Sequence, residues 1–141
     1  MPQMTDIEWR DFVMTGTLTG KLAVTRSDGR PHVTPIWFVL DGDDIVLTTD
    51  KNSIKGRALR RDPHAALCVD HQEPPYHFAM IEGRVALSND PGELFRWATA
   101  IRCRYMGPEN AEQFGARAAV PDELLVRLRA TRVIAQWKMA R

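Results

Sequence analysis

The chain has 141 residues and a mass of 16.0 kDa, a length that predicts a single domain spanning residues 1–141. Hydrophobic residues make up 44% and charged residues 26% of the sequence, and the net charge is only +1, which argues against a general attraction to nucleic acid or anionic membranes. No segment approaches the roughly 20 apolar residues of a membrane span, and the N-terminus lacks the basic and apolar regions of a signal peptide, so we expect a cytoplasmic protein.

The first predicted element is a helix that begins at the capping box Thr5 to Glu8 and ends near Gly16. From Lys21 the pattern changes to three runs rich in β-branched and apolar residues, separated by turn sequences at residues 27–29 and 41–43. These runs predict two successive hairpins, and hence an antiparallel meander.

The second of these strands contains two prolines, Pro31 and Pro35. Each proline removes one backbone hydrogen-bond donor from the sheet. We therefore expect this strand to lie at an edge, to be bulged, or to lie close to a ligand.

Ser53 is a good N-cap for a short helix that must stop before Pro63, since the residue before a proline avoids the helical region. Two further strands are predicted at residues 64–72 and 77–88, joined by a rigid Pro74-Pro75 link.

A longer helix is predicted from Asp90, a capping residue followed by proline and glutamate, to Gly107. Two shorter helices are expected at residues 109–118 and 122–129. The last segment, residues 131–139, alternates apolar and polar side chains as a half-buried strand does.

These elements add up to a mainly β protein with inserted helices. About six antiparallel strands favour a small closed or split β-barrel over a doubly wound sheet. The chain has no G-x-G-x-x-G turn, so a Rossmann dinucleotide site is not expected.

The chemistry of an anion site gathers around the start of the helix capped by Ser53. Two hydroxyls at a strand end, the capping hydroxyl and a first-turn lysine are the candidate phosphate ligands: Thr48, Thr49, Ser53 and Lys55. Three further cations extend along the same helix: Arg57, Arg60 and Arg61. The alternative is an ordinary solvated basic helix face, and the residues alone leave both interpretations open.

Other kinds of site have little support in the sequence. The four histidines lack zinc-ligand spacing, and no G-x-S-x-G elbow marks a nucleophile, so we expect no metal and name no catalytic residue. Trp37 and Trp137 could wall an aromatic cofactor, although large aromatics at strand spacing are more often core residues.

The segment from Gly29 to Pro63, together with the Glu-Gly pair at 82–83, resembles the pyridoxamine 5′-phosphate oxidase-like superfamily of split β-barrel flavoproteins. The similarity covers roughly residues 18–87. The pattern DGRP, strand, D-G, strand, T, then S-x-K-x-R-x-L-R-R-D-P and E-G is most similar to the branch that uses the deazaflavin coenzyme F420. This resemblance implies a homodimer with the cofactor across its interface.

The resemblance also implies roles for particular residues. The cofactor phosphate is expected at Thr48, Thr49, Ser53 and Lys55, in agreement with the anion site above. The flavin or deazaflavin ring is expected to lie against Thr34, Pro35, Ile36 and Trp37. The following strand is expected to approach the cofactor with His77, Phe78, Ala79 and Met80, and Trp137 matches a C-terminal tryptophan near the flavin in oxidase relatives.

Two departures from the oxidase pattern affect the expected activity. The chain ends shortly after Trp137 without the arginine- and histidine-rich segment that holds substrate phosphate in true oxidases, so oxidation of pyridoxamine phosphate is not expected. The basic helix with Arg57, Arg60 and Arg61 suits the polyglutamate tail of F420 better than the single phosphate of FMN. F420 is therefore the expected cofactor, with FMN as the alternative.

The expected function is a reductase that passes a hydride from reduced deazaflavin to a conjugated planar acceptor such as a quinone, an unsaturated lactone or a tetrapyrrole. The proton donor stays open between solvent, Tyr76 and a histidine. The alternatives are an FMN-binding oxidoreductase of the same fold and a non-catalytic carrier of flavin, haem or F420. A barrel that binds single-stranded nucleic acid is disfavoured by the near-neutral charge.

Overall fold

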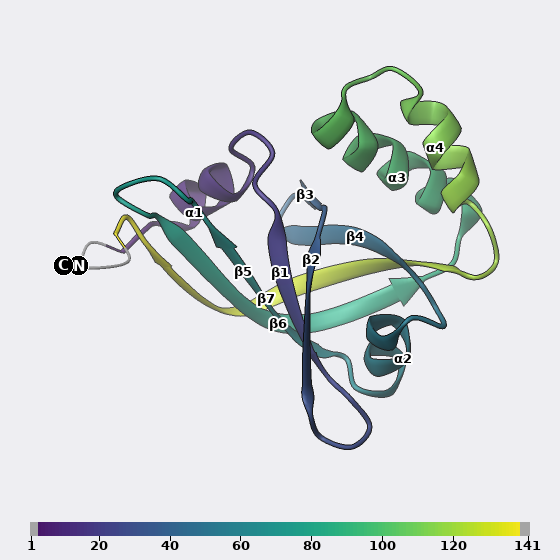
Figure 1. Cartoon of the computed structure of the whole chain (residues 1–141), viewed down its shortest axis with the longest axis horizontal. Coiled ribbons are helices and arrows are strands. Elements are labelled where there is room, and N and C mark those ends of the chain that lie inside the picture. Colours follow the sequence, from purple (N-terminus) through teal and green to yellow (C-terminus); the bar gives the residue numbers. More distant parts are fainter. Residues whose placement is uncertain (1–2, 139–141) are drawn as a thin grey trace.

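The computed structural model describes residues 3–138, which form a twisted antiparallel sheet with helices at its ends (Figure 1). Four helices lie in this part of the chain: α1 (Asp6–Val13), α2 (Ile54–Arg61), α3 (Pro91–Met106) and α4 (Ala111–Ala118). Seven strands accompany them: β1 (Gly20–Thr25), β2 (Pro31–Ile36), β3 (Val39–Asp41), β4 (Asp44–Asp50), β5 (His64–Asp70), β6 (Phe78–Ser88) and β7 (Glu123–Gln136). The expected mainly β, antiparallel class is confirmed, with one strand more than the six or so predicted.

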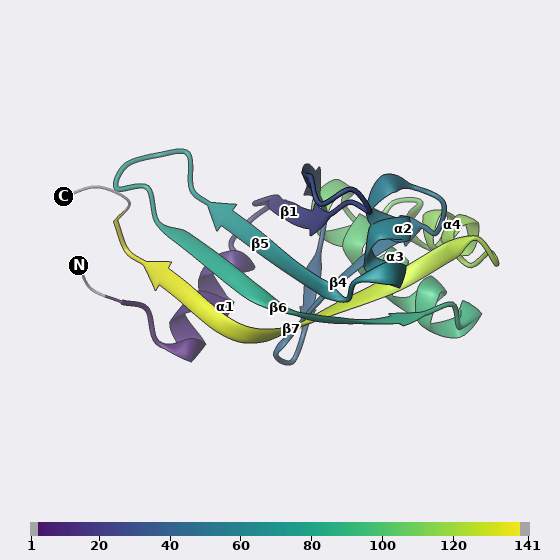
Figure 2. The ribbon, with the colours of Figure 1, turned by 90° about the horizontal axis from the view of Figure 1, so that it is seen from below.

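The sheet closes on itself because of one short connection. Its strand order is β2-β1-β5-β6-β7-β4-β3, so β2 and β3 form its two opposite edges. Only Trp37 and Phe38 separate these strands along the chain, a distance of at most about 11 Å between the flanking Cα atoms. The two edges must therefore come close together, as in a split barrel, and Figure 2 shows the resulting curvature of β5, β6 and β7.

The predicted meander is wrong in one respect. The hairpins β1–β2 and β3–β4 are present, but the strand that they were expected to share is broken at Trp37 and Phe38. Phe38 is fully buried, and its backbone N–H donates to the Tyr105 hydroxyl at 3.4 Å instead of to a neighbouring strand. Tertiary packing of one aromatic residue thus divides a continuous β pattern into two edge strands.

The prolines lie where edge strands tolerate them. β2 pairs only with β1, and Pro31 and Pro35 are both exposed on it. A missing N–H on the outer side of an edge strand breaks no ladder bond. Of the three alternatives expected for this strand, the structure shows the edge position.

Local capping signals place three helix starts correctly. In α1 the Thr5 N–H donates to Glu8 Oε1 at 2.9 Å, and the Glu8 N–H donates to Thr5 Oγ1 at 3.2 Å. Asp90 caps α3 by accepting from the Glu93 N–H at 2.9 Å, with Pro91 in the first turn. Each cap satisfies N–H groups that have no partner inside the helix.

The helix predicted at residues 122–129 is wrong, because this segment forms the first half of the 14-residue strand β7. The strand lies between β4 and β6 and pairs with both. Consecutive Leu124, Leu125 and Val126 are all buried because one face points into the barrel and the other lies under α3. The strand predicted at residues 131–139 is the second half of β7 up to Gln136, and Met139 lies outside the described residues.

Two hydrophobic clusters stabilise this arrangement. The larger fills the barrel and includes Leu22, Phe38, Leu67 and Ile81, all at most 1% exposed. The smaller packs α3 against the outer side of β3, β4 and β7 through residues such as Val46, Leu94, Trp97, Ile101 and Leu125. Among the described residues, no helix is long and apolar enough to cross a membrane.

Candidate cofactor site

The start of α2 packs tightly against the end of β4. Ser53 Oγ accepts from the Gly56 N–H at 3.0 Å and donates to the Asp50 carbonyl oxygen at 2.7 Å, so the cap also ties the helix to the strand. A Cβ atom at Gly56 would lie 2.2 Å from that same carbonyl oxygen, so only glycine permits this close approach. The predicted N-cap role of Ser53 is confirmed.

The two threonines at the end of β4 point to opposite sides of the strand. Thr49 is 6% exposed and its hydroxyl lies 3.0 Å from Ser53 Oγ. Thr48 is paired with Leu125 and lies on the face covered by α3. The structure therefore brings Thr49 and Ser53 together, and leaves the Thr48 side chain on the other face of the sheet.

Lys55 lies in the first turn of α2, beside two acidic residues. Burial raises the pKa of the Glu123 carboxyl group, the Asp50 carboxylate raises it further, and the Lys55 ammonium group acts in the opposite direction. Oε1 of Glu123 is buried and has no hydrogen-bond partner among residues 3–138. The positive charge of Lys55 is therefore partly balanced by Glu123, which was not among the site residues predicted from the sequence.

The three arginines of α2 differ in their contacts. Arg60 donates to the Lys51 carbonyl oxygen at 2.9 Å, and Arg61 donates to the Thr25 carbonyl oxygen. Arg57 is exposed and makes no side-chain hydrogen bond or ion pair with any residue in 3–138. Arg57 and Arg61 line one pocket together with the β1–β2 turn, whereas Arg60 does not.

The segment expected to line the cofactor ring, Thr34 to Trp37, forms the end of β2 and the break after it. Ile36 is buried and Pro35 is exposed, while the hydroxyl of Thr34 is buried without a partner among the described residues. Trp37 is 37% exposed and stacks on Tyr105, with ring centroids 4.9 Å apart and planes 5° from parallel. The Trp37 side chain is therefore partly accessible to a ligand, while one face of its ring packs on Tyr105 of α3.

The residues expected to approach from the following strand lie at the other end of the sheet. His77 Nδ1 contacts the Trp137 carbonyl oxygen, and the His77 ring meets those of Phe12 and Trp137 edge to face, at 5.9 Å and 5.1 Å. These three residues and His71 line a pocket of about 360 Å³ between α1 and the β5–β6 loop. Ala79 is fully buried in the core, whereas Phe78 and Met80 lie on the outer face of β6.

One chain does not gather all the expected residues into one cavity. α2 and the start of β6 lie at opposite ends of the sheet (Figure 1), and neither the α2 pocket nor the His77 pocket contains residues of both groups. The segment Thr34 to Trp37 lines neither of these pockets.

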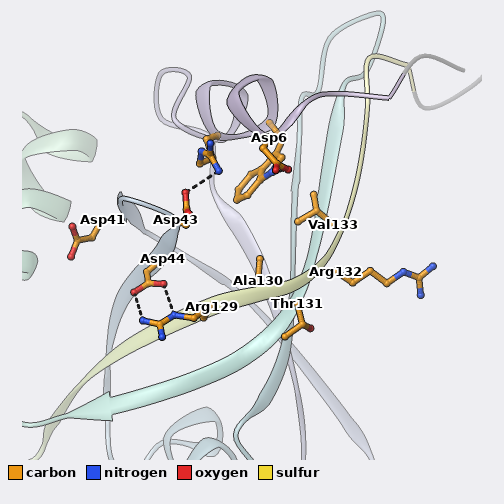
Figure 3. Close-up of a pocket in the computed structure, with 11 residues that line it drawn as sticks. Asp6, Asp41, Asp43, Asp44, Arg129, Ala130, Thr131, Arg132 and Val133 are labelled. Carbon is orange, nitrogen blue, oxygen red and sulfur yellow. Dashed lines mark hydrogen bonds and ion pairs between the residues drawn. The ribbon is translucent and has the colours of Figure 1, made fainter.

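A separate polar pocket of about 580 Å³ lies between α1, the β3–β4 hairpin and β7 (Figure 3). Its acidic side chains are matched by arginines: Arg10 lies 2.8 Å from Asp43, and Arg129 lies 3.2 Å from Asp44. Arg132 points away from these pairs in Figure 3. Because two of its arginines are paired with aspartates and Arg132 points away from them, this pocket is poorly suited to recognising an anion.

Comparison with known proteins identifies the family. The family model described as pyridoxamine 5′-phosphate oxidase matches residues 6–137. The chain belongs to the pyridoxamine 5′-phosphate oxidase family. The resemblance inferred from the motifs between Gly29 and Pro63 is therefore confirmed at the level of the family.

Solved structures of similar proteins include several members of this fold. A conserved hypothetical protein from Mycobacterium tuberculosis is 28% identical, with a TM-score of 0.81 over 92% of this chain and 82% of that one. A protein described as an F420 reductase is 26% identical, with a TM-score of 0.70 over 87% and 94% of the two chains. A haem-binding protein from Mycobacterium smegmatis is 21% identical, with a TM-score of 0.71 over 100% and 57%, and shows a shared fold only.

Several residues near the expected site of this pyridoxamine 5′-phosphate oxidase family member escaped the sequence analysis. They are Arg26, Ser27, His71, Tyr105 and Glu123, and all except His71 come from an element remote in sequence from the expected residues that they join. Of these five residues, only Ser27 lay in a recognisable sequence pattern. That pattern predicted a turn and no binding role. Within residues 3–138, no group of three or more histidine, cysteine or acidic side chains is arranged to hold a metal ion.

Proposed function

We propose that this member of the family is an oxidoreductase that uses coenzyme F420 to reduce a conjugated, planar small molecule. The observation that carries the proposal is the start of α2, where the Thr49 and Ser53 hydroxyls lie 3.0 Å apart and Lys55 follows in a first turn without acidic residues. Similarity to an F420 reductase at 26% identity over 87% of the chain supports the same cofactor.

The donor set at α2 fits a phosphate group. The first N–H groups of a helix have no partner within it, and the helix dipole favours a negative charge at this end. The Gly56 N–H and the Thr49 hydroxyl are already bound to Ser53 Oγ, which leaves the preceding N–H groups of the helix and the Lys55 ammonium group for the ligand. Lys55 supplies the formal positive charge of this set.

The other end of the cofactor fits the segment after β2. The buried Thr34 hydroxyl, which has no partner among the described residues, would be satisfied by a polar atom of a ring. Trp37 offers an aromatic edge held in place by Tyr105. When bound and reduced, F420 supplies a hydride at C5 of its ring. The chain's own residues then bind the phosphate, orient the ring and exclude water.

A binding titration tests this proposal. Purified protein is titrated with F420 and with FMN at two salt concentrations, with tryptophan fluorescence as the readout. We expect tighter binding of F420, weakening with salt. We expect Lys55→Ala to raise the Kd about tenfold or more, since it removes a charge-assisted hydrogen bond. Arg117→Gln is the charge-matched control, because Arg117 is exposed on α4 and away from α2.

Three outcomes are distinguishable. Tighter binding of FMN than of F420 would assign the protein to flavin chemistry. Unchanged F420 affinity in Lys55→Ala would remove the phosphate site at α2. Tight F420 binding followed by hydride transfer to a quinone in a stopped-flow assay would establish the reductase.

A second candidate function is a non-catalytic carrier of a flat aromatic ligand such as haem. The pocket of about 360 Å³ lined by Phe12, His71, His77 and Trp137 supports it, because it combines aromatic walls with two imidazole rings. A haem titration followed by absorbance separates the two. A carrier would bind its ligand and transfer no hydride, and His77→Ala would weaken haem binding.

A further inference from the structure

We propose that the pocket between α1 and the β5–β6 loop binds a planar aromatic cation, such as a protonated heteroaromatic amine. This site is separate from the anion site at α2 and does not rest on the use of F420. Haem, whose propionate groups are anionic, is the competing ligand for the same pocket, and the test below distinguishes the two.

The pocket has aromatic walls and a volume of about 360 Å³, within the range of small-molecule sites. The His77 ring meets Phe12 of α1 edge to face, with ring centroids 5.9 Å apart, and meets Trp137 in the same way at 5.1 Å. Pro74 and Pro75 line the pocket from the β5–β6 loop. These walls and this volume suit a flat ligand of about three fused rings.

The pocket opens on the α1 side of the sheet. His77 contacts Phe12, and Trp137 packs against the hydrophobic cluster inside the barrel. Phe78 and Met80, by contrast, lie on the outer face of β6. Figure 1 shows α1 and the β5–β6 loop at the end of the sheet away from α2. The pocket is therefore distinct from the basic region at α2 and from the outer face of the sheet.

The charged side chains of the pocket are acidic. Glu8 and Asp11 both come from α1, and because they are three residues apart they lie on the same face of the helix. None of the nine lining residues is lysine or arginine. The pocket therefore attracts a cation and repels the propionates of haem or the phosphate of a flavin nucleotide.

The two carboxylates keep capacity for a ligand. One oxygen of Glu8 accepts from the Thr5 N–H at 2.9 Å, which leaves its second oxygen available. The exposed Asp11 carboxylate has no side-chain hydrogen bond or ion pair with any residue in 3–138. An N–H group of a bound cation can therefore gain a charge-assisted hydrogen bond without breaking one.

Two neutral side chains of the pocket also present acceptors. The Thr15 hydroxyl donates its hydrogen to the Asp11 carbonyl oxygen at 3.2 Å, so it can only accept from a ligand. His77 Nδ1 contacts the Trp137 carbonyl oxygen. Because a carbonyl group only accepts, Nδ1 carries the proton and the neutral ring keeps Nε2 as an acceptor. These acceptors match the N–H groups of a heteroaromatic amine.

An aromatic cation combines both kinds of complementarity. Its rings bury apolar surface against Phe12 and Trp137, and its positive charge is favoured by the electron-rich faces of aromatic rings as well as by the carboxylates. A neutral ring of the same shape gains only the first of these contributions. The charge of the ligand should therefore determine its affinity for this pocket.

The test titrates the full chain by calorimetry at pH 7.5 with three probes of one ring system and different charge, and with haemin. The three are 9-aminoacridine, which is a cation at this pH, neutral acridine and acridine-9-carboxylate. The variants are Asp11→Asn, the double variant Glu8→Gln with Asp11→Asn, and Trp137→Leu. Glutamine at position 8 can still form the capping box of α1. Glu112→Gln, at an exposed position on α4, is the matched control, and thermal unfolding checks each variant.

We expect wild type to bind 9-aminoacridine about tenfold more tightly than acridine, with the carboxylate probe weaker still and the preference reduced by salt. Asp11→Asn should weaken binding of the cation about threefold, and the double variant about tenfold, while neither changes the affinity for acridine. Trp137→Leu should weaken binding of both ring systems about tenfold, and Glu112→Gln should change nothing.

Equal affinity of wild type for 9-aminoacridine and acridine would overturn the proposal, because the carboxylates would then select nothing. Unchanged binding of 9-aminoacridine in the double variant would place the cation elsewhere on the protein and would also overturn it. Tighter binding of haemin than of 9-aminoacridine, lost in Trp137→Leu, would assign the pocket to haem instead.

Discussion

Glu123 lies beside Lys55 and opposes the binding of an anion there. Its carboxylate is half-buried at the start of β7, and one oxygen has no partner within residues 3–138. Burial and the neighbouring Asp50 raise its pKa, so the folded protein favours the protonated form more than the unfolded chain does. Ionisation of Glu123 at neutral pH therefore costs stability and also reduces the positive potential around Lys55.

We predict that Glu123→Gln raises the free energy of unfolding at pH 7.5 and tightens F420 binding several-fold. The direction of the expected change in stability follows from the raised pKa of Glu123. The favourable contribution of the protonated carboxyl group is present below the unfolded pKa and is lost as the pH rises through the folded pKa. The difference from wild type should therefore disappear at about pH 4.

Urea unfolding at pH 4 and pH 7.5 measures this effect. Glu112→Gln, at an exposed position on α4, is the control. An equal change at both pH values would show that Glu123 acts through packing and not through its charge.

At the scale of elements, the C-terminal end of α3 joins three parts of the chain. Arg104 donates to the carbonyl oxygens of Val13 at 2.8 Å, Gly16 at 3.1 Å and Phe38 at 2.7 Å. Burial lowers the pKa of its guanidinium group. The adjacent Tyr105 donates to the Leu18 carbonyl oxygen at 2.7 Å and stacks on Trp37. This end of α3 therefore holds the chain at the break between β2 and β3.

We predict that Arg104→Met destabilises the protein by about 2–4 kcal/mol, because it leaves partly buried carbonyl groups without partners. Chemical denaturation measures the loss. The tryptophan fluorescence of the native state should also change, because Trp37 lies at the break between β2 and β3 that the end of α3 holds in place. Arg117→Met, which removes an exposed arginine from α4, should leave both properties unchanged. A wild-type unfolding midpoint in Arg104→Met would contradict the structural role of Arg104.

At the scale of the whole molecule, one outer face of the sheet lacks a covering layer. The strand registers place seven apolar side chains there, together with Glu82 and the ion pair of Lys21 and Asp70. The apolar residues are Ala23, Val33, Pro35, Ala66, Cys68, Phe78 and Met80. Val33 is 64% exposed. A second copy of the chain on this face would bury apolar surface and enclose a flat cofactor, which is the homodimer that the family resemblance implies.

We predict a homodimer at micromolar concentration, with a mass twice the 16.0 kDa of one chain in light scattering. Val33→Asp should shift the equilibrium toward monomer and weaken F420 binding in parallel. Val120→Asp introduces the same charge at an exposed apolar position between α4 and β7 and should do neither. A monomeric wild type that still binds F420 tightly would place the whole cofactor site within one chain.

Local signals in the sequence determined the helix caps at Thr5, Ser53 and Asp90, the two hairpin turns and the edge position of β2. Each depends on residues a few positions apart, so propensity and hydrogen bonding within a short segment are sufficient. The family motif and the candidate anion residues of α2 were also readable, because they lie in one continuous stretch. Their role as a cofactor site stays a prediction.

Contacts between segments far apart in the chain determined the features of the fold and the site that local sequence patterns did not predict. Phe38 divides one β pattern into two edge strands only because Tyr105 and the barrel core receive it. Residues 122–129 form a strand because β4 and β6 pair with them on both sides, which outweighs their local helical pattern. The placement of Glu123 beside Lys55 and of Arg26 beside Arg57 depends on the same long-range pairing. Such contacts have no local signal because their energy comes from burial and pairing between segments far apart in the chain.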